Sequence, residues 1–477
     1  MDQQDTFPLP SDAKKPAEGS EGDKNSQPTK YAWVPQFIAR HLRGSSVRAR
    51  LAKGVVWSVL AGVITRSLFV LLSIVLARML GETEFGKWGM VQATVAALSV
   101  VAGMGIGHTL TKHLAELRDT DIARAGRVFS LGMAIAILAH VAIAVLCACF
   151  AGVIARKALG RPEMTTPVAL SCVIVVPIGI ASVLQCCLAG FEAFRQVAKA
   201  RAVEMVVTFV AMVALTWAMG LTGAIIGFAF GQVVCLVLFA GVLRGLFRQY
   251  RIVVGTAGLG RELAVLWHYL VPSLLSGLVM SPAHWVGLAL VTRQPSGYSG
   301  MAGYAASQRW RGLVGFLPAR IMLVALPVMS QLKGLGDVRR YKKTFTVNMA
   351  LTLAAGLVVA APIGFCSRWI MGLYGQDFVD KYDVLLVLLS VAVVQGGLGI
   401  FTQLFMSCGK VWWTFWFSVL WAGLLVGGSI WLVPAYGIRG FVWSMLGAYI
   451  VSFMTQLAAS RILLKGHLDP EVLPEAQ

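Results

Sequence analysis

Charged residues are scarce in this 477-residue chain, and acidic residues are the scarcer kind. Asp, Glu, Lys and Arg together make up 13% of the sequence, whereas soluble domains carry about 25%. Hydrophobic residues make up 57%, and the mean hydropathy is +0.74. This balance excludes a soluble enzyme, a collagen-like chain and a disordered chain. It predicts an all-α, polytopic membrane protein, because apolar runs recur along almost the whole length.

Signatures of catalysis and of metal binding are missing as well. The chain has no Walker A loop, no HExxH, no G-x-S-x-G and no set of His and Cys residues with metal-ligand spacing. Its eight cysteines form no CxxC pair, and nearly all lie within apolar runs, so we interpret them as small apolar residues. No loop is long enough for a catalytic domain. The sequence therefore predicts a protein that is not an enzyme and that carries no metal or cofactor.

Apolar segments of roughly twenty residues are long enough to cross about 30 Å of hydrocarbon as helices. Short connections separate them, the longest in the second half of the chain being residues 367–383. We predict twelve spans, six in each half of the chain. They are residues 55–77, 88–110, 128–152, 167–189, 203–219, 223–243, 267–290, 303–329, 346–366, 384–406, 413–432 and 440–460.

The two ends of the chain differ in composition from the spans. Residues 1–53 are predicted to be a cytoplasmic tail, disordered at first and ending in a basic, aromatic stretch at 31–53. That stretch suits either an amphipathic helix on anionic lipid or a solvated charge run. No cleaved signal peptide is expected. The two predicted domains of six spans each follow at 54–243 and 267–460, and a second cytoplasmic tail follows at 461–477.

Basic residues outnumber acidic ones, which gives the chain a net charge of +19. If both termini are cytoplasmic, the inner segments hold 28 Lys and Arg residues and the outer loops hold 9. Cytoplasmic loops are typically enriched in Lys and Arg, so this bias predicts that both termini are cytoplasmic. It accounts for much of the basic charge without nucleic acid as a partner. Anionic lipids are the expected partners of the basic segments.

An internal repeat joins the two halves of the chain. Glycines recur at an offset of 217, as Gly220 and Gly437 do in the phrases GLTGAIIGF (220–228) and GIRGFVWSM (437–445). Six spans return a chain to the side on which it started, so the two halves have the same orientation. The repeat therefore predicts a pseudo-two-fold axis along the membrane normal.

Four arginines lie inside predicted spans: Arg66 in the first span and Arg309, Arg311 and Arg320 in the eighth. An arginine at a helix centre costs about 2.5–3.5 kcal/mol on insertion scales, and it usually faces a bundle interior or a cavity. Snorkelling is the alternative for Arg309 and Arg311, whereas Arg66 is too far from either interface. No acidic residue is expected at mid-membrane, Glu204 being the nearest. A water-filled cavity that receives an anionic, phosphate-containing substrate resolves this imbalance.

The repeat brings further polar residues to the same helices. Position 66 maps onto position 283, beside His284 in the seventh span, and Arg309 maps onto Gln92 in the second span. The polar positions therefore gather on spans 1, 2, 7 and 8, which are expected to face a central cleft. His284 is compatible with substrate binding, with proton uptake or with plain helix packing.

Several phrases resemble those of one transporter family, in the expected order and over about residues 55–460. They are ARMLGETEFGKWGMVQ (77–92), GMGIGHTLTKHLAE (103–116), LAGFEAFRQ (188–196), LPARIMLVALPVMSQL (317–332), YGQDF (374–378) and WLVPAYGIRGFVWS (431–444). The chain resembles the polysaccharide transporters, which are the Wzx-like flippases of lipid-linked oligosaccharides in the MOP (MATE-like) superfamily. The resemblance implies two six-helix bundles around a central cavity.

The resemblance also implies an activity. Members of this family flip polyprenyl-diphosphate-linked glycans to the outer leaflet, and cationic residues on their first and eighth helices are typical. Arg66, Arg309 and Arg320 match that pattern. The implied substrate is an undecaprenyl-diphosphate-linked oligosaccharide, and the implied partners are polysaccharide-assembly proteins such as a polymerase or a chain-length regulator. Coupling to H⁺, to Na⁺ or to the membrane potential stays open. The alternatives are a cation-coupled multidrug exporter of the same superfamily, a membrane glycan polymerase or ligase, and an assembly scaffold.

Overall fold

The computed structural model describes residues 47–103, 106–255, 263–334 and 337–466. Within these residues every regular element is a helix, which confirms the all-α prediction. Eight of the described helical segments are long and apolar enough to cross a membrane. The predictions for the polar N-terminal tail and for the basic stretch up to residue 46 lie outside the described residues. The arrangement given below is that of the unit Gly54–Gln477.

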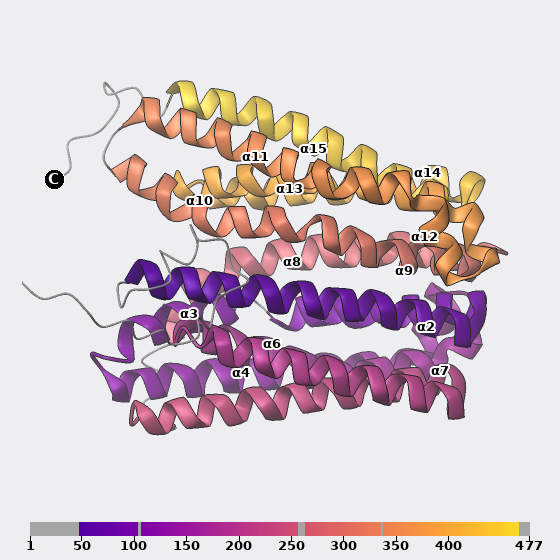
Figure 1. The fold of residues 1–477 in the computed structure, drawn as a ribbon, viewed down its shortest axis with the longest axis horizontal. Helices are drawn as coiled ribbons and strands as arrows, with labels where there is room; N and C mark the ends of the chain where they lie inside the picture. The colour runs from indigo at the N-terminus through magenta and orange to yellow at the C-terminus, as the bar shows by residue number, and fades with distance from the viewer. Residues whose placement is uncertain (1–46, 104–105, 256–262, 335–336, 467–477) are drawn as a thin grey trace, which may run out of the picture. The chain divides into compact units, whose positions relative to one another are not determined.

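The first half of the chain contributes four of these eight apolar segments, joined by short elements (Figure 1). Asp121 caps the N-terminus of α4 by accepting a bond from the backbone N–H of Arg124, as Asp residues commonly do. The elements are α2 (Val47–Gly103), α3 (Ile106–Leu117), α4 (Ile122–Cys149), α5 (Ala151–Val153), the π-helix η1 (Ile154–Ala158), the 3₁₀-helix η2 (Pro162–Met164), α6 (Thr165–Gly190) and α7 (Phe194–Gln249).

The second half repeats this order with different interruptions. Its predicted loop 367–383 is in fact structured, because it contains a short helix and a 3₁₀-helix. The elements are α8 (Leu263–Thr292), α9 (Gly297–Val314), α10 (Phe316–Gly334), α11 (Val338–Phe365), α12 (Ser367–Tyr374), η4 (Gln376–Lys381), α13 (Tyr382–Ser407), α14 (Val411–Tyr436) and α15 (Ile438–Gly466).

The longest helices, α2 and α7, each reverse direction at a single glycine. Gly81 of α2 has φ 72° and ψ 174°, a conformation that glycine adopts at little cost. Phe69 and Gln92, on either side of it, line the same small cavity, which a straight helix would not allow. We divide α2 at Gly81 and α7 at Gly220, count α3 with the second arm of α2, and count α9 and α10 as one broken span. The order of the helices is then consistent with twelve spans in two bundles.

The internal repeat is visible in the backbone. Gly220 of α7 has φ 57° and ψ −134°, and Gly437, 217 residues later, has φ 55° and ψ −130°. After Gly220 the chain returns along itself, so that Gly231 packs against Thr208. The same reversal joins α14 to α15 at Gly437. The two halves therefore bend at equivalent positions with nearly equal dihedral angles.

Two contacts between the halves also carry the repeat offset. Arg309 donates to Gln92, and Ser299 donates to Glu82 over 2.8 Å, and each pair is separated by 217 residues. A two-fold rotation exchanges position i with position i+217, so equivalent residues meet only where they lie near its axis. These pairs place the pseudo-two-fold axis between the second arm of α2 and α9.

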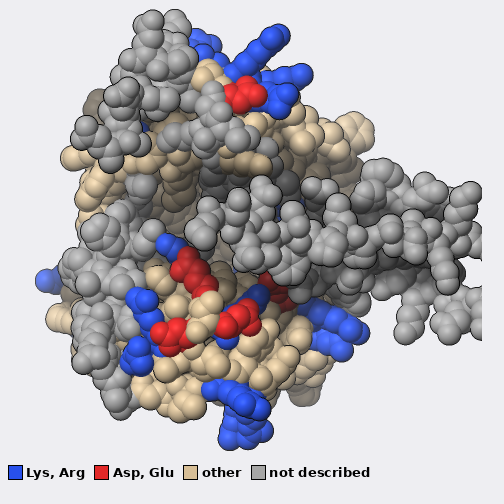
Figure 2. Space-filling view, turned by 90° about the vertical axis from the view of Figure 1, so that its left-hand side faces the viewer, with Lys and Arg blue, Asp and Glu red and all other residues tan. Residues whose placement is uncertain are grey.

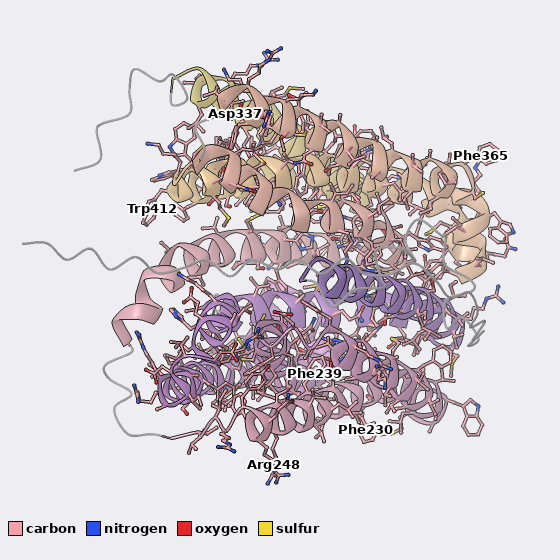
Figure 3. All side chains as sticks on the ribbon, turned by 60° about the vertical axis from the view of Figure 1, so that its left-hand side comes forward. Phe230, Phe239, Arg248, Asp337, Phe365 and Trp412 are labelled. Carbon is pink, nitrogen blue, oxygen red and sulfur yellow. The ribbon has the colours of Figure 1, made fainter. Side chains whose placement is uncertain are left out.

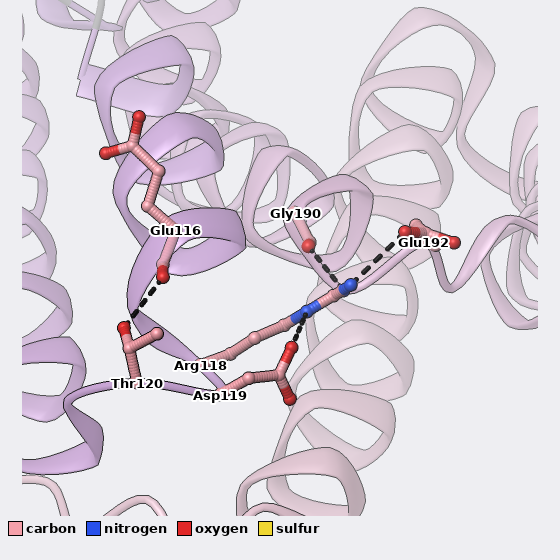
Figure 4. Close-up of polar contacts among 6 residues, drawn as sticks. All are labelled: Glu116, Arg118, Asp119, Thr120, Gly190 and Glu192. Carbon is pink, nitrogen blue, oxygen red and sulfur yellow. Dashed lines mark hydrogen bonds and ion pairs between the residues drawn. The ribbon is translucent and has the colours of Figure 1, made fainter. Parts of the chain in front are cut away.

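At the end of the molecule where α4 begins, an arginine connects two loops (Figure 4). Arg118 donates to the Gly190 carbonyl over 2.9 Å and pairs with Glu192 and Asp119, each over 3.2 Å. Burial lowers the pKa of Arg118, but hydrogen bonds to the two carboxylates outweigh burial and raise it overall. Lys and Arg side chains surround this end, with Asp and Glu among them (Figure 2).

Large apolar side chains cover the outside of the helices. Phe365 is 93% exposed and points outward (Figure 3), and Trp217 and Trp431 are each 85% exposed. Water would make such a surface unfavourable, whereas lipid tails solvate it. The exterior therefore fits the multi-pass membrane protein that the composition predicts, and the polar groups gather inside.

Candidate functional site

A cavity of about 860 Å³ opens inside the unit. Helices α2, α3, α6 and α7 of the first half form most of its wall, and α9 and α10 close the opposite side. It extends to Phe194, the first residue of α7, and so reaches the end at which α4 begins. Its charged and amide-bearing lining residues are Arg66, Arg201, Arg309, Arg320, Glu204, Gln185, Gln232 and Gln308.

Two arginines share one aromatic ring in the cavity wall. The guanidinium carbons of Arg66 and Arg320 each lie 4.9 Å from the centre of the Phe316 ring, so the two cations are at most twice that distance apart. Arg66 also donates to the Gly312 carbonyl. Among the described residues, no carboxylate pairs with Arg66. Like charges this close in a partly buried site repel each other, and a bound anion relieves that repulsion.

Arg309 stands at the boundary between this cavity and a smaller one next to α2. Its guanidinium carbon lies 4.4 Å from the centre of the Phe69 ring, and it donates to Gln92, the predicted partner on the second span. Its Nε atom is buried and has no hydrogen-bond partner. A buried donor without an acceptor is costly, so this atom is available to an anion that enters the cavity.

The eighth predicted span is broken. Helix α9 ends at Val314, Gly315 forms a turn, and α10 starts at Phe316. Arg309 and Arg320 are predicted to lie in one span, whereas they lie on two helices. Both residues nevertheless line the cavity.

The cavity wall also contains an acidic residue, which corrects one expectation. Glu204 was expected at the end of a span, but it lies about three turns into α7 and is 6% exposed. Its carboxylate is 3.5 Å from Arg201 and accepts hydrogen bonds from Thr208 and Gln232, over 3.4 and 3.3 Å. The one acidic residue in the described wall of this cavity is therefore already paired with Arg201.

Sequence reasoning missed Arg201. The predicted fifth span starts at residue 203, whereas α7 starts at Phe194, so the prediction leaves Arg201 outside the spans. Its guanidinium lies 5.0 Å from the Phe239 ring centre and donates to Gln185, which also lines the cavity. The spacing of Arg201 and Glu204, three residues apart with opposite charges, was the signal that would have placed both on one helix face.

Three predicted site residues lie outside the large cavity, and one of them, Gln92, lines the smaller one. His284 is half-buried within the second half, and its Nε2 contacts the Tyr304 hydroxyl over 2.7 Å. Arg311 donates to Gln308 and to Gln395, over 2.9 and 2.7 Å. Gln308 also donates to Tyr304 over 2.7 Å, and Gln308 itself faces the cavity. The structure therefore connects His284 and Arg311 to the cavity only through other side chains.

At the opposite end, where α2 reverses, contacts between the halves close the molecule. Glu82, which follows the reversal, pairs with Lys381 of η4 and accepts from Ser299 of α9. Arg78 donates to the Leu373 carbonyl over 2.7 Å. A side chain at Gly86 would clash with the Tyr298 carbonyl, at 1.9 Å from its Cβ, so the backbones approach closely there. The cavity thus extends toward one end only.

These features define a class of protein. A many-helix membrane fold has two related halves, a cationic cavity between them and contacts that close one end. The described residues contain no group of three or more His, Cys, Asp or Glu residues that would hold a metal ion. The architecture is that of a transporter, and the comparisons with known proteins identify its family.

The chain belongs to the polysaccharide biosynthesis protein family, whose model matches residues 51–333. The EPS I polysaccharide export inner membrane protein EpsE of Ralstonia nicotianae is 21% identical over 429 residues, which are 87% of this chain and 94% of that protein. A second EpsE, from Ralstonia solanacearum, is 20% identical over 83% of this chain and 90% of its own length. These findings confirm the resemblance that the sequence phrases indicate.

Solved structures confirm the fold. An inward-facing multidrug resistance MATE transporter of the MOP superfamily matches with a TM-score of 0.66 and 14% identity, over 88% of this chain and all of its own. The lipid II flippase MurJ, in an inward closed conformation, matches with a TM-score of 0.67 and 14% identity, over 85% of this chain and 87% of its own. The chain therefore shares its fold with these two membrane proteins.

Proposed function

We propose that this protein flips an undecaprenyl-diphosphate-linked oligosaccharide from the cytoplasmic to the outer leaflet of the bacterial inner membrane, for polysaccharide biosynthesis. The observation that carries the proposal is the cationic cavity. Four arginines and one glutamate line it, and that glutamate already pairs with Arg201. A diphosphate offers several anionic oxygens, and guanidinium groups bind such oxygens through strong, paired hydrogen bonds.

Each polar group has a role in this proposal. Arg66, Arg320 and Arg309 bind the diphosphate, because all three line the same cavity. Gln185 and Gln232, on the opposite wall, donate and accept hydrogen bonds with sugar hydroxyls. The lipid tail stays in the bilayer and passes between the two halves. The protein acts as a transporter and not as an enzyme.

The cavity's direction supports alternating access. Under the predicted topology, the end at which α4 begins is cytoplasmic, so the structure is open toward the cytoplasm and closed outside. Breaking the contacts of Glu82 and forming new ones at the cytoplasmic end would then open the site outward. Rigid halves that rock about a central site are typical of transporters built from repeats. Transport in the outward direction is driven by H⁺, by Na⁺ or by the membrane potential.

The relatives' names agree with this class of activity. EpsE is described as a polysaccharide export inner membrane protein, and MurJ as a lipid II flippase. The competing proposal is a multidrug exporter, since MATE transporters share the fold. An exporter of organic cations would need a net acidic cavity, whereas Glu204 is outnumbered by arginines here.

The test uses a strain that lacks the gene. Its lipid-linked glycans are extracted, and a sugar-reactive probe that cannot cross the membrane reports which of them face outward. Complete precursor held on the cytoplasmic side, and released by the wild-type gene but not by Arg66→Ala, is the expected result. Arg66→Lys should restore export partly, because an ammonium ion keeps the charge but loses the paired hydrogen bonds.

The matched control is Arg368→Ala, which removes an exposed arginine outside the cavity. It should rescue export as well as wild type does. Full export by a correctly inserted Arg66→Ala would contradict the assigned site. Normal outward delivery in the deletion strain, together with new resistance to organic cations on expression, would favour the drug exporter.

A further inference from the structure

A second cavity, separate from the first, lies where α4, α6 and the end of α7 meet. It has a volume of about 520 Å³. Phe129 of α4, Leu184 of α6 and Phe247 of α7 form its apolar walls. None of the residues that line it lines the larger cavity. The proposed function therefore makes no use of it.

Three arginines surround this groove: Arg244 and Arg248 near the end of α7, and Arg251 just after it. All three are exposed, and no ion pair or hydrogen bond is formed by their side chains within the described part of the chain. Arg248 points away from the bundle (Figure 3). Three unpaired cations beside an apolar groove match a ligand with an anionic head and an apolar body.

The backbone at Arg251 shows that this arrangement is held in place. Arg251 has φ 57°, in the left-handed region where a non-glycine residue costs roughly 1 kcal/mol. It ends α7, and the next N–H, that of Ile252, donates to the Phe247 carbonyl over 2.9 Å. The carbonyl of Val253 then packs so closely on Gly126 of α4 that a Cβ there would lie 2.0 Å from it. An arginine thus occupies a position where glycine would be less strained.

We propose that this groove binds an anionic glycerophospholipid of the surrounding bilayer. Arg244, Arg248 and Arg251 contact the headgroup phosphate, and an acyl chain lies along Phe129 and Leu184. The exposed side chains of Val253 and Val254, 75% and 56% accessible, continue the apolar surface toward the bilayer. The bound lipid neutralises the three cations and fixes the end of α7 against α4.

The probe is phosphatidylglycerol, with phosphatidylcholine as the neutral comparison. Each lipid is titrated into the purified full-length protein in detergent, and native mass spectrometry counts the lipids retained. Wild type should retain phosphatidylglycerol preferentially. The triple variant Arg244→Gln, Arg248→Gln, Arg251→Gln should bind it roughly a hundredfold more weakly, since it removes all three cations that attract the anionic headgroup. Its binding of phosphatidylcholine should not change.

The matched control removes three exposed positive charges from the start of α11 in the other half: Arg339→Gln, Lys342→Gln and Lys343→Gln. It should stay within about twofold of wild type, since it lies outside the groove. A third variant, Ala240→Trp, fills the groove from its exposed side and keeps all three arginines, and it should also lose the lipid.

Equal retention of phosphatidylglycerol by the groove triple variant and by the control triple variant would overturn the proposal. So would full retention by Ala240→Trp. If the triple variant fails to fold, Ala240→Trp alone decides the question. None of these measurements depends on glycan transport, so the lipid site and the proposed function stand or fall separately.

Discussion

The two halves of this molecule have similar backbones, but the side chains at equivalent positions differ. Glu204 and Gln232, which hydrogen-bond over 3.3 Å in the first half, correspond at the offset of 217 to Trp421 and Tyr449. Those two rings pack with centroids 5.2 Å apart and are 4% and 5% exposed. A polar pair in a cavity wall in one half is therefore an aromatic pair in a filled core in the other.

The same difference holds for the arginine at the centre of the cavity. Arg66 corresponds to Ala283, which is buried and small. The first half thus forms most of the cavity wall, whereas the second half contributes α9 and α10 to it and is packed with apolar side chains at these equivalent positions. The comparison teaches that a repeat conserves bends and helix order, while the side chains at equivalent positions are free to specialise.

The largest expected effect breaks the filled half. Trp421→Ala should lower the free energy of unfolding by about 3–5 kcal/mol, because it leaves a void in a packed core. Gln232→Ala, at the position equivalent to Tyr449, should cost only about 1–2 kcal/mol, because it enlarges a cavity that already exists. Thermal unfolding of both proteins in the same detergent checks this order. Equal losses would mean that both interiors are equally packed.

The next effect concerns the ion pair in the hollow half. Arg201→Gln should destabilise the protein by about 2–3 kcal/mol, since it leaves the Glu204 carboxylate buried without its cation. Glu204→Gln should cost less, because a neutral amide keeps bonds to Thr208 and Gln232. A double-mutant cycle on unfolding should give a coupling of roughly 1–3 kcal/mol. No measurable coupling would show that Arg201 does not stabilise Glu204.

Glu204→Gln also frees Arg201 within the cavity. The cavity then becomes more cationic, so the proposed anionic substrate should bind more tightly and be released more slowly. Export at low precursor supply should fall less than export at high supply. Thr208→Val, which removes a weaker contact to the same carboxylate, is the control and should change neither.

A smaller effect is expected on the equilibrium between the inward-open conformation and the proposed outward-open one. Glu82→Gln with Lys381→Gln removes an ion pair that joins the halves at the closed end. Partly exposed pairs of this kind are worth about 0.2–1 kcal/mol, enough to raise the population of the outward-open state a few-fold. Cys186 lines the cavity and reports its access, so its labelling by an impermeant maleimide from outside should increase.

The control for this experiment breaks a different ion pair. Asp383→Asn removes the pair with Arg439, which joins two elements of the second half. It should leave the labelling of Cys186 unchanged, and Cys186→Ser should abolish the specific signal. Increased labelling after Asp383→Asn would show that any loss of charge at this end opens the cavity.

The smallest effect compares two turns. Glu192 has φ 57°, and Gly409, its equivalent in the repeat, has φ 73°. Gly409→Ala should destabilise the protein by about 1 kcal/mol, since alanine is strained there. Glu192→Gly relieves the same strain but loses the pair with Arg118, so its net effect should be below about 0.5 kcal/mol. A thermal shift assay distinguishes the two, and a large loss in Glu192→Gly would mean that the Arg118 contact dominates.

Much of the fold could be predicted because lipid demands it. Helices in hydrocarbon must satisfy their own backbone hydrogen bonds, so apolar length alone indicates most spans. The reversals at Gly81 and Gly220 could also be predicted, because both glycines lie in connections between predicted spans. The break between α9 and α10 could not be placed, because a glycine within an apolar helix is compatible with continuing or turning.

The candidate site was only partly accessible from sequence. Arg66, Arg309 and Arg320 were singled out because charge inside a membrane is costly, and the structure brings all three into one cavity. Arg201 could not be predicted as a site residue, because span ends are uncertain by several residues. A basic residue near a span end is also expected simply from the enrichment of Lys and Arg in cytoplasmic loops. His284 is assigned to the site by the repeat offset, and Arg311 by its charge inside a span. Neither the offset nor the charge indicates which face of the helix a residue occupies.

The sequence by itself determined that this is a helical membrane protein of two related halves, with cations where lipid disfavours them. Composition, apolar length and the offset of 217 are properties of the chain alone. Tertiary structure decided which half is hollow, which arginines share the cavity and which carboxylate joins them. The physical reason is that burial and pairing depend on contacts between helices that are far apart in the sequence. The pattern of residues along one helix does not specify which face of another helix it contacts.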